Sequence, residues 1–154
     1  MFRRYIILGA ALILAACTAP PPSQIIDAGN GCAVHNPNPK SGERISWSGS
    51  CRDGFAHGPG TIAWFLDDKP NGRFEGVLAG GRIEGEGTAH YPSGNHYTGD
   101  FLRGQPNGTG IFYFADGRRF EGDWRDGRPE GAGIMFSKDG EATPQTWNAG
   151  QRIK

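Results

Sequence analysis

The stretch YTGDFLRGQPNGTGIFYFADGRR, residues 97–119, decides the fold, because its pattern of aromatic residues and glycines recurs on both sides of it. Four units can be aligned on an opening aromatic residue, and the openers are spaced 27, 23 and 23 positions apart: Trp47, Phe74, Tyr97 and Phe120. In every unit the opener is followed by glycines 2, 7, 11 and 13 residues later. A fixed period in this range predicts an array of structural repeats.

The spacing of rings and glycines inside a unit predicts β-structure. Side chains two residues apart on a strand share a face, so Tyr97, Gly99 and Phe101 should point to the same side. Glycine weakens a strand, and its recurrence indicates that a ring or a neighbouring backbone approaches closely. We therefore expect each opening ring to lie over glycines of the adjacent strand. Asp-Gly pairs supply the positive φ of tight turns, and they occur at 53–54, 116–117, 126–127 and 139–140.

The pattern aromatic-x-Gly-x-aromatic-x-x-Gly-x-x-x-Gly-x-Gly strongly resembles the MORN repeat family, over residues 47 to about 150. Each unit is then one β-hairpin, and the predicted fold is an all-β, elongated, single-layer antiparallel sheet. The resemblance implies four repeats and a degenerate closing half-repeat: 47–73, 74–96, 97–119, 120–142 and 143–154. The first unit carries four extra residues in the segment 66–72, which predicts a protruding hairpin loop. MORN arrays are associated with scaffolding, dimerisation and lipid binding.

The N-terminal segment, residues 1–16, has the pattern of an export signal. Arg3 and Arg4 precede an apolar run that is about half the ~20 residues of a transmembrane helix. The sequence Leu-Ala-Ala-Cys at residues 14–17 resembles the bacterial lipobox, which implies cleavage before Cys17 and acylation of that residue. An ordinary secretory signal is the alternative. Because Thr18, rather than Asp, follows the cysteine, the resemblance implies an anchor in the outer membrane, with the chain facing the periplasm.

A tether and a cap are predicted between the signal and the first repeat. Residues 17–29 begin as a polar, proline-rich segment that suits a tether. Residues 30–46 belong to a segment that resembles the leader ahead of some bacterial MORN arrays, which implies a cap on the first hairpin. An even pair of cysteines in a small exported domain predicts a disulfide between Cys32 and Cys51, worth about 3 kcal/mol in the chain-entropy model.

Metal binding is the competing interpretation of the two cysteines, with His35 and His57 as further ligands. The position of His57 argues against it, because the other units place Glu84, Asn107 and Glu130 at the same offset. We therefore predict no metal site and no cofactor.

Composition and motifs exclude several functions. Without Arg3 and Arg4, 14 basic residues remain against 16 acidic ones, a formal net charge of −2. This charge gives no footprint for nucleic acid. The Gly-x-Gly motifs are followed by strand-like residues rather than a helix, and the chain contains no Gly-x-Ser-x-Gly motif. We therefore predict that the protein is not an enzyme.

The rings and the opposite face of the sheet supply the candidate partner surface. The rings either pack on one another as a closed core or leave a groove open to a partner. The opposite face becomes more apolar toward the C-terminus, which predicts a contact with another protein or self-association. The candidate partner-binding residues are Tyr91, Tyr97, Phe112, Tyr113, Phe114, Phe120 and Phe136. The alternative function is an envelope structural factor that binds peptidoglycan glycan or phospholipid directly.

Overall fold

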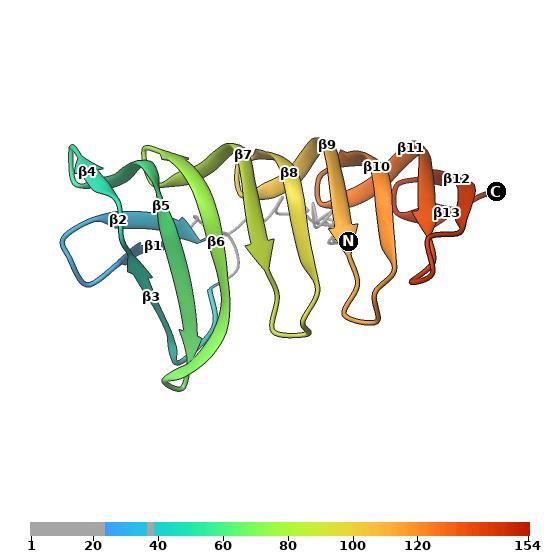
Figure 1. The fold of residues 1–154 in the computed structure, drawn as a ribbon. Coiled ribbons are helices and arrows are strands. Elements are labelled where there is room, and N and C mark those ends of the chain that lie inside the picture. Colours follow the sequence, from blue (N-terminus) through green and yellow to red (C-terminus); the bar gives the residue numbers. More distant parts are fainter. Residues whose placement is uncertain (1–23, 37–38) are drawn as a thin grey trace, which may run out of the picture.

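The computed structural model describes residues 24–36 and 39–154, and within them the chain forms thirteen strands and no helix (Figure 1). The strands are β1 (Gln24–Asp27), β2 (Ala33–Asn36), β3 (Glu43–Trp47), β4 (Ser50–Arg52), β5 (Phe55–Leu66), β6 (Lys69–Ala79), β7 (Arg82–His90), β8 (His96–Leu102), β9 (Gln105–Tyr113), β10 (Arg119–Arg125), β11 (Arg128–Phe136), β12 (Ala142–Asn148) and β13 (Gln151–Arg152).

The strands from β5 to β13 pair antiparallel in chain order, so the repeats form one open, elongated meander (Figure 1). The register brings equivalent residues of successive repeats together. Gly99 on β8 faces Gly110 on β9, and Gly110 faces Gly122 on β10, so the glycines form a row across the sheet. The predicted all-β antiparallel sheet of tandem hairpins is confirmed.

The strands are joined by two kinds of turn, which alternate from β7 onward. Two-residue turns with positive φ at both positions occur at 53–54, 67–68, 80–81, 103–104, 126–127 and 149–150. The longer loops between the other strands have positive φ at one glycine each: Gly94, Gly117 and Gly140. The predicted Asp-Gly turns at 53–54 and 126–127 therefore have the expected backbone, whereas at 116–117 and 139–140 only the glycine is left-handed.

Hydrogen bonds link the two-residue turns at 80–81, 103–104, 126–127 and 149–150 to the preceding repeat. The amide of Gly104 donates to the Ile83 carbonyl at 3.0 Å, and the amide of Gly127 donates to the Pro106 carbonyl at 2.9 Å. The same bond recurs at Gly150, which donates to the next equivalent proline. Neighbouring hairpins are thus held at a fixed spacing by their turns as well as by their strands.

The core consists of the opening rings and the glycines beneath them. Phe74 and Tyr97 are fully buried, and a Cβ atom on Gly87 or Gly110 of the adjacent strand would clash with their rings. Gly133 has the same relationship to the opening ring of the fourth repeat. The prediction that rings cover glycines of the adjacent strand is confirmed. The ring also covers the glycine two residues along its own strand, as Phe74 does at Gly76.

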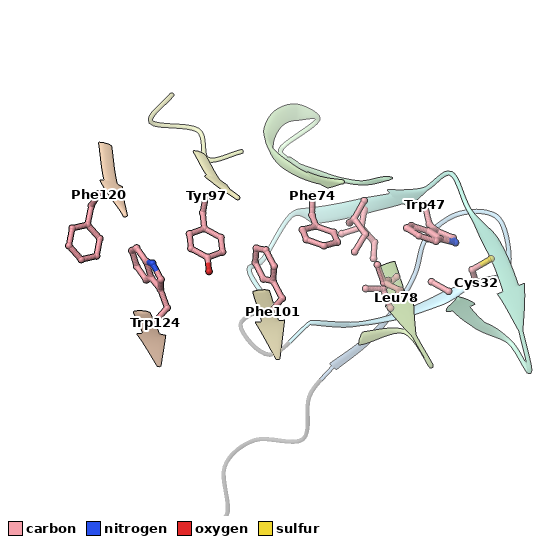
Figure 2. Close-up of a cluster of buried hydrophobic side chains, with 13 residues drawn as sticks. Cys32, Trp47, Phe74, Leu78, Tyr97, Phe101, Phe120 and Trp124 are labelled. Atoms are coloured by element: carbon pink, nitrogen blue, oxygen red, sulfur yellow. The ribbon is translucent and has the colours of Figure 1, made fainter. Parts of the chain in front are cut away.

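In the second to fourth repeats, the strand that carries the opening ring is bent, and these bends fold the single sheet around the core. The pairing of β8 with β9 shifts register between Gly99 and Phe101, and as a result the rings of Tyr97 and Phe101 meet edge to face at 5.2 Å. Figure 2 shows the opening rings on one side and Leu78, Phe101 and Trp124 on the other, with their side chains pointing toward one another. The sheet is one layer thick, yet it encloses apolar side chains on its inner face.

The N-terminal strands close one end of the array. Strand β2 pairs parallel with β5 where Ala33 faces Phe55, while β3 and β4 pair antiparallel with β5. The Ala33 amide donates to the Gly54 carbonyl, and the His35 amide donates to the Gly81 carbonyl, both at 2.8 Å. The cap therefore lies against the two-residue turns of the first two repeats.

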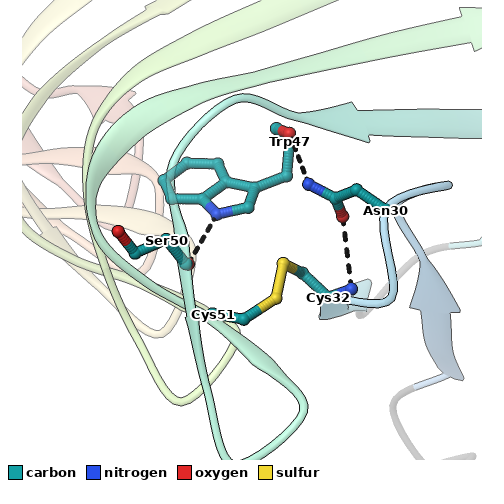
Figure 3. The surroundings of a disulfide bond; sticks show 5 residues. All are labelled: Asn30, Cys32, Trp47, Ser50 and Cys51. Carbon is teal, nitrogen blue, oxygen red and sulfur yellow. Dashed lines mark hydrogen bonds between the residues drawn. A yellow bond between two sulfur atoms is a disulfide. The ribbon is translucent and has the colours of Figure 1, made fainter.

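A disulfide and two polar side chains fasten the cap (Figure 3). Cys32 and Cys51 are joined, with their Cα atoms 5.5 Å apart, as the sequence predicted. Asn30 accepts from the Cys32 amide at 3.2 Å and donates to the Trp47 carbonyl at 2.9 Å. The Trp47 indole in turn donates to the Ser50 carbonyl at 2.9 Å. Trp47, which opens the first repeat, is thus hydrogen-bonded through both its backbone carbonyl and its indole.

The first repeat differs from the prediction in one respect. Its extra residues do not form a loop: β5 and β6 are lengthened, and a two-residue turn at Asp67 and Asp68 joins them. The long hairpin projects beyond its neighbours in Figure 1.

The predicted leader 1–16, the acylation site Cys17 and most of the tether lie outside the described residues. Within the described part of the chain, no helix has the length and apolar character needed to cross a membrane.

Candidate interaction surface

The seven residues predicted to contact a partner divide between the two faces of the sheet. Tyr97 and Phe120 belong to the core, with 0% and 2% of their surface exposed. The alternation of side chains along a strand does not show which face becomes buried when the sheet bends. Here the face that carries the opening rings is buried. These two side chains therefore stabilise the fold and have no surface to offer a partner.

Three more of the predicted residues lie on the inner face at the margin of the core. Phe112 and Phe114 are partly buried and meet each other edge to face at 4.9 Å. Tyr91 is 37% exposed and lies 6.0 Å from the Phe112 ring. Burial raises the pKa of the Tyr91 phenol, so this side chain is a neutral hydrogen-bonding group at ordinary pH.

The remaining two, Tyr113 and Phe136, lie on the outer face, opposite the core. They belong to a row of cross-strand neighbours on six consecutive strands, which we call the outer-face ladder: Arg73, His90, His96, Tyr113, Arg119 and Phe136.

Close contacts join most members of the outer-face ladder. The Arg73 guanidinium lies 3.2 Å from His90 Nε2, and the His90 and His96 rings stack at 5.5 Å. The Tyr113 ring stacks on His96 at 4.3 Å, with 9° between their planes. At the far end, the Arg119 guanidinium lies 3.8 Å from the centre of the Phe136 ring. The result is a flat strip of stacked planar groups held by the strand register.

Carboxylates beside the outer-face ladder balance its arginines. Arg73 donates to Glu75 at 2.7 Å, and Arg119 donates to Glu121 at the same distance. Burial lowers the pKa of His90, and the positive charge of Arg73 lowers it further, against the smaller raising effect of Glu75. His90 is therefore uncharged at neutral pH, and the strip carries little net charge around it.

A shallow furrow follows the glycine row on the same outer face, from β8 to β12. It has a volume of about 770 Å³, and its walls carry Ile111, Glu121 and Ile134 on one side and Thr109 and Asp123 on the other. Ile134 is 40% exposed. Apolar and acidic side chains thus line a groove next to the outer-face ladder.

The histidines and arginines of the ladder were not among the predicted site residues. A sequence signal for them exists, because the residue before each opener is an outer-face position: Arg73, His96 and Arg119 precede Phe74, Tyr97 and Phe120. Their partners on the next strand could be found only once the register was known.

The competing metal interpretation has no support in the described residues. Cys32 and Cys51 are joined to each other, and the ring of His35 stacks on Phe55 at 5.6 Å. Within the described ranges, no group of three or more His, Cys, Asp or Glu side chains is arranged to hold a metal ion.

The fold and these surfaces define a class of protein: a one-dimensional array of β-hairpins in which each repeat contacts its neighbours and presents an extended outer face. The sequence model of the MORN repeat matches residues 47–65, 74–96, 97–118 and 120–142. The chain therefore belongs to the MORN repeat family. MORN repeats suggest an interaction or scaffold module, and the family is generally a non-enzymatic binding module. A comparison with curated proteins found no match.

Proposed function

We propose that this protein is a non-enzymatic, lipid-anchored interaction module of the bacterial cell envelope, which holds a protein partner on its outer face. The outer-face ladder is the observation that carries the proposal. Its rings and guanidinium groups are already fixed by stacking and ion pairs, so a partner would immobilise few free rotamers when it binds. Aromatic residues and arginine are also the residue types enriched at binding hot spots.

The furrow supports a protein as the partner. Its exposed Ile134 and the carboxylates of Glu121 and Asp123, one on each side, combine apolar and polar groups, as protein interfaces commonly do. An extended or helical segment of a partner could occupy it while the ladder contacts flanking side chains.

Photo-crosslinking in intact cells tests this surface. A photoreactive residue replaces Tyr113 or Phe136, and Val77, which is 43% exposed on another part of the sheet, provides the control position. We expect one discrete foreign protein in adducts from the first two positions and not from the control. Adducts formed only with a second copy of the chain would indicate self-association instead of a foreign partner. Adducts with glycan or phospholipid alone would contradict the proposal and favour direct binding of the envelope.

The anchor is tested separately. We expect mature protein from bacterial cells to carry acyl groups on Cys17, detected by intact mass, and to sediment with outer membranes. The Cys17→Ser variant should lose both properties. A mature chain without acyl mass would remove the membrane part of the proposal and leave the partner surface unaffected.

A further inference from the structure

A cavity of about 400 Å³ lies on the inner face, between the capping strands and the first three repeats. Val34 of the cap lies on one side, and Trp64, Ile83 and Phe101 of the repeats lie on the others. Small-ligand pockets commonly have volumes of about 300–1,000 Å³ and mainly apolar walls. The cavity has the size and the lining of such a pocket.

One small residue accounts for the space. The position 15 residues after each opener lies on the inner face and carries Ile62, Ala89, Phe112 and Met135 in the four repeats. In the third repeat the large residue packs against the core, where Phe112 lies 5.9 Å from Trp124. In the second repeat Ala89 fills far less of the equivalent space, and it lines the cavity. The repeat pattern is broken at the point where the pocket opens.

Cations surround the apolar walls. Lys40, Arg82 and Arg103 line the cavity, and within the described parts of the chain none of them forms an ion pair. The one carboxylate in the lining, Glu43, already accepts hydrogen bonds from the Asn36 amide and from the Lys40 backbone. The three cations outnumber this carboxylate, and an apolar interior with an excess of positive charge is complementary to a molecule with an apolar tail and an anionic head.

We infer that this cavity binds a single-chain aliphatic carboxylate, whose chain lies between Ala89, Ile83 and Phe101 and whose head group is paired with Arg82 and Arg103. Two members of the outer-face ladder, Arg73 and His90, also line the cavity, whereas Tyr113 and Phe136, the positions at which the partner surface is tested, do not. Arginine suits the role because its guanidinium can donate two parallel hydrogen bonds to a carboxylate.

Titration with sodium octanoate tests the inference directly. The full chain is used with Cys17→Ser, so that no acyl group can be attached, and binding is followed by calorimetry and by the fluorescence of Trp64, which lines the cavity. Trp64→Phe identifies the fluorescence change that comes from this site. We expect saturable binding of octanoate and at least tenfold weaker binding of octanol and octyltrimethylammonium, which lack the negative charge.

Two substitutions and a matched control locate the site. Arg82→Gln should weaken octanoate binding about tenfold, because it removes a charge-assisted pair. Arg128→Gln alters the equivalent arginine of the fourth repeat, which does not line the cavity, and should leave binding unchanged.

Filling the cavity should weaken octanoate binding without unfolding the protein. Ala89→Phe introduces the residue that the third repeat has at this position, and Ala89→Met introduces the residue of the fourth, in case the larger ring is not accepted. We expect both variants to fold and the filled cavity to bind octanoate at least tenfold more weakly. Absence of saturable octanoate binding, equal binding of octyltrimethylammonium, or unchanged octanoate binding in a folded Ala89 variant would each overturn the inference.

Discussion

The phenol ring of Tyr97 lies over Gly110 of the neighbouring strand, and no larger side chain fits at Gly110. The Tyr97 hydroxyl reaches past this glycine to the carbonyls of Asp100 and Thr109, at 3.2 and 3.3 Å. The glycine spacing of the repeats is thus a packing requirement: the ring is buried because the backbone beneath it has no Cβ.

Gly110→Ala should lower the free energy of unfolding by about 1–3 kcal/mol, the usual cost of overpacking a core. Urea denaturation measures the change. In a double-mutant cycle, Tyr97→Leu should reduce the cost of Gly110→Ala, because a smaller side chain leaves room for the methyl group. Strictly additive effects would show that the two residues do not compete for the same space.

Tyr97 should also make the protein sensitive to alkaline pH. Burial raises the pKa of its phenol well above the ordinary value of about 10, and the negative charge of Asp100 raises it further. The unfolded chain therefore releases this proton near pH 10, while the folded chain retains it. The stability contribution is complete below pH 10 and is lost as the pH rises above it.

Tyr97→Phe tests this linkage. The variant should be less stable at pH 7, because the hydrogen bond that the hydroxyl shares between two carbonyls is lost. Its free energy of unfolding should nevertheless fall less steeply between pH 9 and about 11. Denaturation midpoints across this range give the comparison. Equal slopes for the two proteins would assign the alkaline sensitivity to other groups.

The disulfide should contribute about 3 kcal/mol, because it closes a loop with a sequence separation of 19 residues. The double variant Cys32→Ser, Cys51→Ser should be less stable by about that amount in chemical denaturation. Wild-type protein in reductant provides the control and should match the variant. If Cys32 and Cys51 of untreated protein from cells both react with an alkylating reagent, the bond is absent in cells.

Replacing Gln145 by an apolar residue of similar size is expected to stabilise the protein. It is 8% exposed, and its Oε1 has no hydrogen-bond partner among the described residues. Gln145→Met should raise the free energy of unfolding by about 1 kcal/mol, since it removes a buried unpaired acceptor at similar volume. The exposed Gln105→Met provides the control and should change stability by less than about 0.5 kcal/mol. A destabilised Gln145 variant would mean that the amide has a partner in solution.

Most of the repeat architecture could be predicted from the sequence, because ring and glycine spacings are direct consequences of strand geometry. The shared face of Tyr97 and Phe101 and the covered glycines followed from period-two alternation, and the turns at 53–54 and 126–127 followed from their Asp-Gly pairs. The bend between Gly99 and Phe101 did not, because a bulge leaves no distinctive residue pattern. Because the bend could not be predicted, the sequence could not show whether the inner rings form a closed core or line a groove open to a partner.

The candidate sites were harder to predict, because they depend on cross-strand register and on departures from the repeat. Tyr113 and His96 are 17 residues apart in the sequence and become stacked neighbours only through the pairing of β8 with β9. Likewise, Ala89 is an ordinary strand residue until it is compared with Phe112 at the same repeat position. Local patterns identify the scaffold, whereas the surfaces come from long-range pairing.

The unequal strand pairing at the two ends of the sheet also affects its fluctuations. At one end, β5 has partners on both sides, and a disulfide ties the capping segment to β4, which pairs with β5. At the other end, β13 pairs with β12 through two residues. Since each hairpin is braced by its neighbours, opening should start at β13 and travel inward one hairpin at a time. Amide hydrogen exchange should therefore slow progressively from the C-terminal hairpin toward the cap.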